Sequence, residues 1–156
     1  MSLHPRFLPL GLFCALLIFW PPTTASGEST GDPRGTLVVN VSGLRSDTGM
    51  VRAGLFTSNK SFPLGVDSLE NLIEAPIRES GARLTFPDLP YGTYSVVVYH
   101  DEDANGSLNR NWIGKPTEGV GVYKPVTSRF PPPKFKDCKF DLNQRQMTVA
   151  ITMNYL

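Results

Sequence analysis

Residues 88–99 read Asp-Leu-Pro-Tyr-Gly-Thr-Tyr-Ser-Val-Val-Val-Tyr, and this stretch decides the class of fold that the sequence predicts. A Gly-x-Tyr step, from Gly92 to Tyr94, stands at the start of an apolar run. Such a step resembles the tyrosine corner of Greek-key sandwiches, whose tyrosine hydroxyl bonds back to the backbone while the ring packs into the core. The alternative is a plain aromatic core residue. Val96, Val97 and Val98 are apolar on both faces, as expected of a central strand.

Further strand patterns flank this stretch on both sides. Apolar and polar residues alternate at period two in residues 36–41 and, most cleanly, in residues 147–155. We expect residues 50–56 to be the partner of the first strand. Residues 140–142 are expected to form a closing hairpin with the last. A short helix is expected from Ser68.

About seven short strands, frequent glycine and proline, and at most one short helix predict an all-β protein. The expected architecture is a single Greek-key β-sandwich, either immunoglobulin-like or prealbumin-like.

The N-terminal residues have the pattern of a secretory signal peptide. Arg6 supplies a positive charge before an apolar run, residues 7–20, which is shorter than the roughly 18 residues of a membrane-spanning helix. Thr23 and Ala25 place small residues at a plausible cleavage site. An uncleaved signal anchor is the alternative.

The expected domain organisation follows from that pattern. Residues 1–25 are the predicted signal peptide, which is removed, and residues 26–35 are a polar, glycine-rich flexible tether. Residues 36–156 form one domain. We expect a secreted or periplasmic protein with no membrane span after cleavage.

The composition of the mature chain excludes some classes of function. Of 15 basic residues Arg6 is lost with the signal, which leaves 14 against 14 acidic residues and a net charge of zero. A neutral chain without a basic run is not expected to bind nucleic acid. Cys138 remains as a single thiol, so no internal disulfide is expected. We interpret Cys138 as an ordinary strand residue.

An acidic stretch, residues 100–109, follows the central strand. It fits the first part of an oxygen-ligand calcium loop, D-x-[DN]-x-[DN]-G, beginning at Asp101. Ligands at alternate positions converge on one hard cation, and Gly106 permits the sharp turn between them. Trp112 occupies the position of the usual bidentate glutamate, and Glu118 from the following loop is a candidate replacement. The candidate ligands are Asp101, Asp103, Asn105, Ser107 (through its carbonyl), Asn109 and Glu118. The alternative is a metal-free turn held by side-chain to backbone bonds, because Asp, Asn and Gly favour turns.

Four stretches carry a resemblance to a known family, namely residues 86–94, 100–108, 113–119 and 133–138. Together they resemble DUF2141, a family of uncharacterised exported bacterial proteins. The resemblance covers nearly all of the mature chain, and it implies an exported β-sandwich without supplying a reaction. Asn109 stands where the family more often has Asp, and Cys138 stands in place of Ala.

Two classes of function are compatible with these residues. The first is a non-enzymatic binding or structural module for an unknown protein or carbohydrate, with calcium as a possible stabiliser of the acidic loop. Four aromatic residues in the adjoining loops are candidates to contact that ligand, although simple packing onto the sandwich is the alternative. They are Trp112, Tyr123, Phe130 and Phe135.

The second class is a metal-assisted hydrolase. His100 stands beside Asp101, and Asp103 and Glu118 would complete a carboxylate site with a metal-bound water. At the end of a buried strand, however, His100 is more often a structural hydrogen-bonding residue. A deep polar pocket holding all four residues would favour the hydrolase, and a surface turn would favour the module.

Overall fold

The structure is a computed structural model that describes residues 32–66, 69, 71–124 and 132–156. The predicted signal peptide and most of the predicted tether lie outside these residues. The described part holds eight strands and one four-residue helix. They are β1 (Arg34–Ser42), β2 (Met50–Phe56), β3 (Ile73–Pro76), β4 (Ala82–Pro90), β5 (Gly92–Asp101), β6 (Val120–Val122), α1 (Phe135–Cys138), β7 (Phe140–Leu142) and β8 (Gln146–Thr152).

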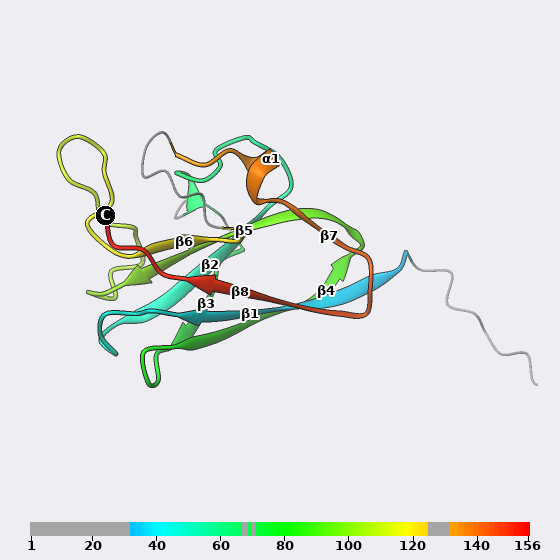
Figure 1. Ribbon diagram of the computed structural model, residues 1–156, viewed down its shortest axis with the longest axis horizontal. Helices are drawn as coiled ribbons and strands as arrows, with labels where there is room; N and C mark the ends of the chain where they lie inside the picture. Colours follow the sequence, from blue (N-terminus) through cyan, green and yellow to red (C-terminus); the bar gives the residue numbers. More distant parts are fainter. Residues whose placement is uncertain (1–31, 67–68, 70, 125–131) are drawn as a thin grey trace, which may run out of the picture. The chain divides into compact units, whose positions relative to one another are not determined.

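The strands form two sheets that face each other, which confirms the predicted all-β sandwich (Figure 1). The smaller sheet has the order β4-β1-β8, with β1 antiparallel to β4 and parallel to β8. The larger sheet has the order β3-β2-β5-β6, and β7 pairs with the first residues of β5. β1 begins at Arg34, earlier than the expected start of the domain at residue 36.

Both predicted strand partnerships between sequence neighbours are wrong. β1 pairs with β4 and β8, whereas β2 pairs with β3 and β5, so the chain crosses from one sheet to the other between β1 and β2. The expected hairpin of β7 and β8 is also a crossing, because β7 lies in the larger sheet and β8 in the smaller one. In both cases the strand finds its partners far along the sequence.

The core fills the space between the two sheets. Val39, Val96 and Ile151 are each at most 1% exposed, and they come from three strands of the two sheets. The predicted alternation in β8 is confirmed, since Val149 and Ile151 are buried while Thr148, Ala150 and Thr152 are exposed. Burying such side chains contributes on the order of 2 kcal/mol each to folding.

β5 is buried on both faces, as its unbroken apolar run predicted. Val96 and Val98 face the core between the sheets, and Val97 and Tyr99 belong to a second apolar cluster on the opposite face. Leu108, from the loop after β5, packs into this second cluster. The second cluster brings the loop of acidic residues onto the outer face of the larger sheet.

The tyrosine corner is present at the start of β5. The Tyr94 hydroxyl donates a hydrogen bond to the Pro90 carbonyl at 2.8 Å, and the Tyr94 ring is buried in the core. A Cβ added at Gly92 would be in ordinary van der Waals contact with the Tyr94 ring.

The single described helix does not lie where a helix was expected. Ile73 begins β3 instead of continuing a helix from Ser68, and the helix that the structure describes is α1. None of the described helices has the length and apolar character needed to cross a membrane.

Candidate functional site

The acidic turn begins where β5 ends. Asp101 is the last residue of β5 and is fully buried, with both carboxylate oxygens hydrogen bonded. Its Oδ1 accepts from the Asn105 amide at 3.0 Å, and its Oδ2 accepts from the Gly106 amide at 2.9 Å. Gly106 has a φ of +85°, which allows the chain to fold back over this carboxylate.

Arg52 supplies the positive charge that a buried carboxylate needs. Its Nε donates to Asp101 Oδ2 at 2.7 Å from the neighbouring strand β2, and its Nη1 pairs with Glu74 at 2.9 Å. The hydrogen bond to Asp101 raises the pKa of Arg52 above its ordinary value. One of the acidic charges at the turn is therefore already compensated within the protein.

Asp103 lies at the exposed edge of the turn and is tied to two asparagines. Its Oδ2 accepts from Asn105 Nδ2 and from Asn109 Nδ2, both at 2.9 Å. The hydrogen bond from Asn109 is the main cause that lowers the pKa of Asp103. Asn105 Oδ1 in turn accepts from the Ser107 amide at 2.7 Å, and Asp103 Oδ1 accepts from the Asn105 amide at 3.2 Å, so these two side chains also fix the backbone.

Glu118 comes from the far end of the loop and closes it. Its Oε1 accepts from the Glu102 amide and its Oε2 from the Asn109 amide, each at 2.9 Å, and the side chain is buried. One carboxylate oxygen from each of Asp101, Asp103 and Glu118 lies within 4.8 Å of the other two. The geometry brings together the three carboxylates that the sequence offered as ligands, although Glu118 stands far from the D-x-[DN]-x-[DN] run.

This cluster has suitable ligands for a hard cation, but hydrogen bonds within the loop are an alternative way of holding it. Carboxylate oxygens are the ligands that calcium prefers. Each carboxylate oxygen can accept about two hydrogen bonds, and Asp101 Oδ1 accepts one here, so some capacity remains. Against this, the amide groups of Asn105 and Asn109 already donate to Asp103. The same contacts therefore hold the loop without an ion.

His100 occupies a structural position behind the turn. The ring is fully buried, and its Nε2 lies 2.7 Å from the Thr48 carbonyl, which can only accept. Nε2 therefore carries a proton, and Nδ1 forms a hydrogen bond with the Tyr155 hydroxyl at 2.8 Å. Burial raises the pKa of Tyr155, which keeps this hydroxyl protonated. Both ring nitrogens of His100 are thus engaged.

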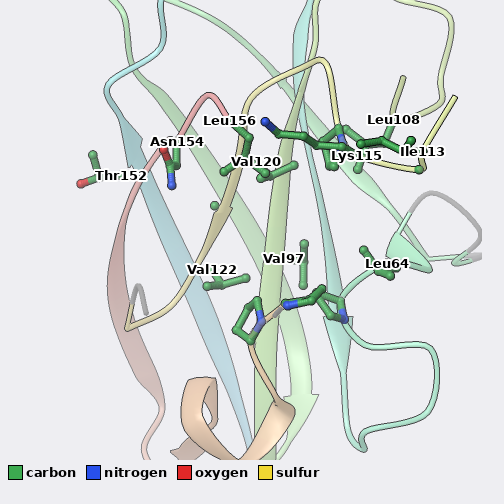
Figure 2. Close-up of a pocket in the computed structure, with 16 residues that line it drawn as sticks. Leu64, Val97, Leu108, Ile113, Lys115, Val120, Val122, Thr152, Asn154 and Leu156 are labelled. Atoms are coloured by element: carbon green, nitrogen blue, oxygen red, sulfur yellow. The ribbon is translucent and has the colours of Figure 1, made fainter. Parts of the chain in front are cut away.

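An apolar groove of about 500 Å³ lies beside the acidic turn, on the outer side of the larger sheet (Figure 2). Val97 and Val122 are on its floor strands, while Leu108 and Ile113 come from the loop between β5 and β6. Of the four residues considered for hydrolysis, none lines this groove. Its other lining residues are Pro63, Leu64, Gly114, Lys115, Pro116, Val120, Gly121, Pro132, Pro133, Thr152, Asn154 and Leu156.

Exposed apolar side chains gather at the rim of the groove. Leu64 and Ile113 both line it and are 53% and 62% exposed. Trp112, the neighbour of Ile113, is 94% exposed at the tip of a turn in which the Gly114 amide donates to the Asn111 carbonyl. The sequence analysis did not predict the groove. The unbroken apolar run from Val96 to Val98 was nevertheless a signal that the outer face of β5 at Val97 is covered.

The three candidate aromatic residues that the structure describes do not form one surface. Tyr123 packs edge-on against Phe140 with ring centroids 5.3 Å apart, and Phe135 packs edge-on against Phe62 at 5.9 Å. Phe135 also begins α1 instead of lying in a loop. Trp112 remains exposed, and Phe130 lies outside the described residues.

Comparison with known proteins gave one family. The family model described as "Uncharacterized protein conserved in bacteria (DUF2141)" matches residues 39–150. Nothing matched among curated proteins or among solved structures. The matched range contains most of the two sheets and the whole acidic turn.

Proposed function

The chain belongs to the DUF2141 family of bacterial proteins, and from that premise we propose that it is an exported, non-enzymatic binding module. Export is supported by the signal-like pattern of residues 1–25, which would deliver the domain to the periplasm or the cell exterior. The ligand site that we propose is the apolar groove, with the acidic turn as the scaffold of its wall.

One observation carries this proposal: a cavity of about 500 Å³ in the described residues is apolar and is separate from the acidic cluster. Its volume lies within the range of about 300–1,000 Å³ that is usual for ligand pockets. Leu108 connects the two features, because it lines the groove while its chain neighbour Asn109 is held by Glu118. A rigid turn therefore fixes one wall of the groove.

Titration with the neutral dye Nile red tests the groove. We expect one saturable site on the mature domain, and we expect Val122→Phe to weaken binding roughly tenfold, about 1.4 kcal/mol, because the larger ring fills the floor. Thr148→Phe is the matched control, since Thr148 is exposed on the smaller sheet. Unchanged dye binding by a folded Val122→Phe variant would count against the groove.

Calcium is the cofactor that we propose for the acidic cluster, in a stabilising role. The convergence of three carboxylates supports it, and the hydrogen bonds from Asn105 and Asn109 to Asp103 oppose it. Calorimetric titration with calcium, with thermal melts alongside, distinguishes a loop that binds calcium from a loop that is held by hydrogen bonds alone. An ion site would be supported if calcium gives saturable heat and raises the Tm of the wild-type domain, and if the heat disappears in Asp103→Ala. No heat at millimolar calcium would leave the loop as a hydrogen-bonded turn.

The alternative function, a metal-assisted hydrolase, has weaker support. His100 is buried with both ring nitrogens hydrogen bonded, so it has no nitrogen free to act on a water. Asp101 is buried and paired with Arg52, and it does not line the apolar groove. Hydrolysis that is lost in His100→Gln but not in a groove variant would revive this alternative.

A further inference from the structure

We propose that the groove binds a single-chain amphiphile with a carboxylate head, of the fatty-acid class, and that Lys115 pairs with the carboxylate. The inference rests on the proposed function, because it assigns a chemical class to the ligand of the same groove. The charge of the lining and the size of the cavity carry it.

Lys115 is the one ionisable side chain among the described residues that line the groove. It lines the groove together with Val120 and Leu156 (Figure 2). Within the described part of the chain its ammonium group has no ion-pair partner. An unpaired cation beside an apolar surface is complementary to a ligand that has an anion at one end and hydrocarbon elsewhere.

The backbone at Lys115 is held in place, so the point from which its side chain extends is fixed by the loop. The Lys115 amide donates to Asn111 Oδ1 at 2.9 Å, and the Lys115 carbonyl accepts from the Asn111 amide at 2.8 Å. Arg110 and Pro116 form a bridge just below this turn. Lys115 therefore extends from a turn that is closed by hydrogen bonds.

The number of charges favours a carboxylate over a phosphate. One lysine balances one negative charge, whereas a phosphate monoester carries close to two and is usually bound by arginine or by several donors. Arg110 does not line the groove, and its Nη1 and Nη2 donate to the Leu108 and Leu64 carbonyls.

The volume favours one chain over two. A water molecule takes about 30 Å³ in the liquid, so 500 Å³ has room for roughly 17 groups of that size. One acyl chain of medium length fits that space, and the two chains of a membrane phospholipid exceed it.

The test is a set of twelve-carbon ligands with different heads, added to the mature domain below their micelle concentrations. Trp112 stands beside Ile113 at the rim and supplies a fluorescence signal, with calorimetry as a second readout. We expect dodecanoate to bind at least tenfold more tightly than dodecanol. Lys115→Met should remove that difference, and Lys115→Arg should preserve it.

Lys139→Met is the matched control, because Lys139 is exposed and does not line the groove. Equal affinity for dodecanoate and dodecanol, no effect of Lys115→Met, or tighter binding of dodecyl phosphate would each overturn the carboxylate assignment while dodecanol and Nile red still bind. If neither dodecanol nor Nile red binds, the proposed groove function itself fails. The two failures are therefore distinguishable.

Discussion

At the residue scale, the tyrosine corner offers a prediction with a control in the same stretch of sequence. Tyr94→Phe removes the hydroxyl that donates to the Pro90 carbonyl and leaves the buried ring. We expect a loss of about 1 kcal/mol in the free energy of unfolding, measured by urea denaturation. Tyr91→Phe is the control, because Tyr91 is only partly buried and has no such bond among the described contacts. Equal effects of the two substitutions would contradict a special role for the corner.

Asp103 offers a second prediction at this scale, one that depends on pH. Hydrogen bonds, first from Asn109, lower the pKa of Asp103, so its ionised form is favoured in the folded protein. A lowered folded pKa adds stability above the ordinary carboxyl pKa, and this stability is lost as the pH falls through the folded value. In the presence of a chelator, Asp103→Asn should therefore be less stable than wild type at pH 7, and the gap should narrow toward pH 3. A gap that stays constant in urea melts at the two pH values would refute the assignment.

At the scale of elements, the loop between β5 and β6 depends on Arg110 for its position. The Arg110 guanidinium donates to the carbonyls of Leu108 and Leu64 at 2.9 and 2.7 Å, and both of these residues line the groove. Arg110 therefore ties the loop after β5 to the loop after β2. We expect Arg110→Met to weaken Nile red binding about tenfold, since the two walls are no longer tied together.

Hydrogen exchange checks this prediction at the same time. Amides of residues 107–117 should lose protection in Arg110→Met, while amides of β1 and β8 keep theirs. Arg83→Met is the control, because Arg83 contacts Asn40 on the smaller sheet and does not line the groove. If the loop amides keep their protection, Arg110 does not hold the walls.

At the scale of the whole domain, the two sheets depend on the side chains packed between them. Ile151 is 1% exposed in β8, and its neighbour Ala150 on the other face is exposed. We expect Ile151→Ala to cost about 2–5 kcal/mol in the free energy of unfolding, because it leaves a cavity between the sheets. Ala150→Gly is a useful contrast for the backbone effect alone, at under about 1 kcal/mol. A cost below 1 kcal/mol for Ile151→Ala would contradict the packing described here.

The local sequence was sufficient for the features that depend on neighbouring residues. The alternation in β8, the two-sided apolar run in β5 and the Gly92–Tyr94 step all predicted what the structure contains, because pleat and turn geometry act over a few residues. The convergence of Asp101 and Asp103 in one turn follows from the same local rule.

Tertiary structure alone decided which strands pair and which surfaces meet. β1 and β2 are neighbours in sequence but lie in different sheets, and β1 instead runs parallel to β8. The groove joins Leu64, Val97 and Leu156, whose distant positions show no shared pattern in the sequence. Local alternation tells which face of a strand is buried, but it carries no information about the partner. Partner choice depends on how all the apolar faces are buried together, so only the complete fold determines it.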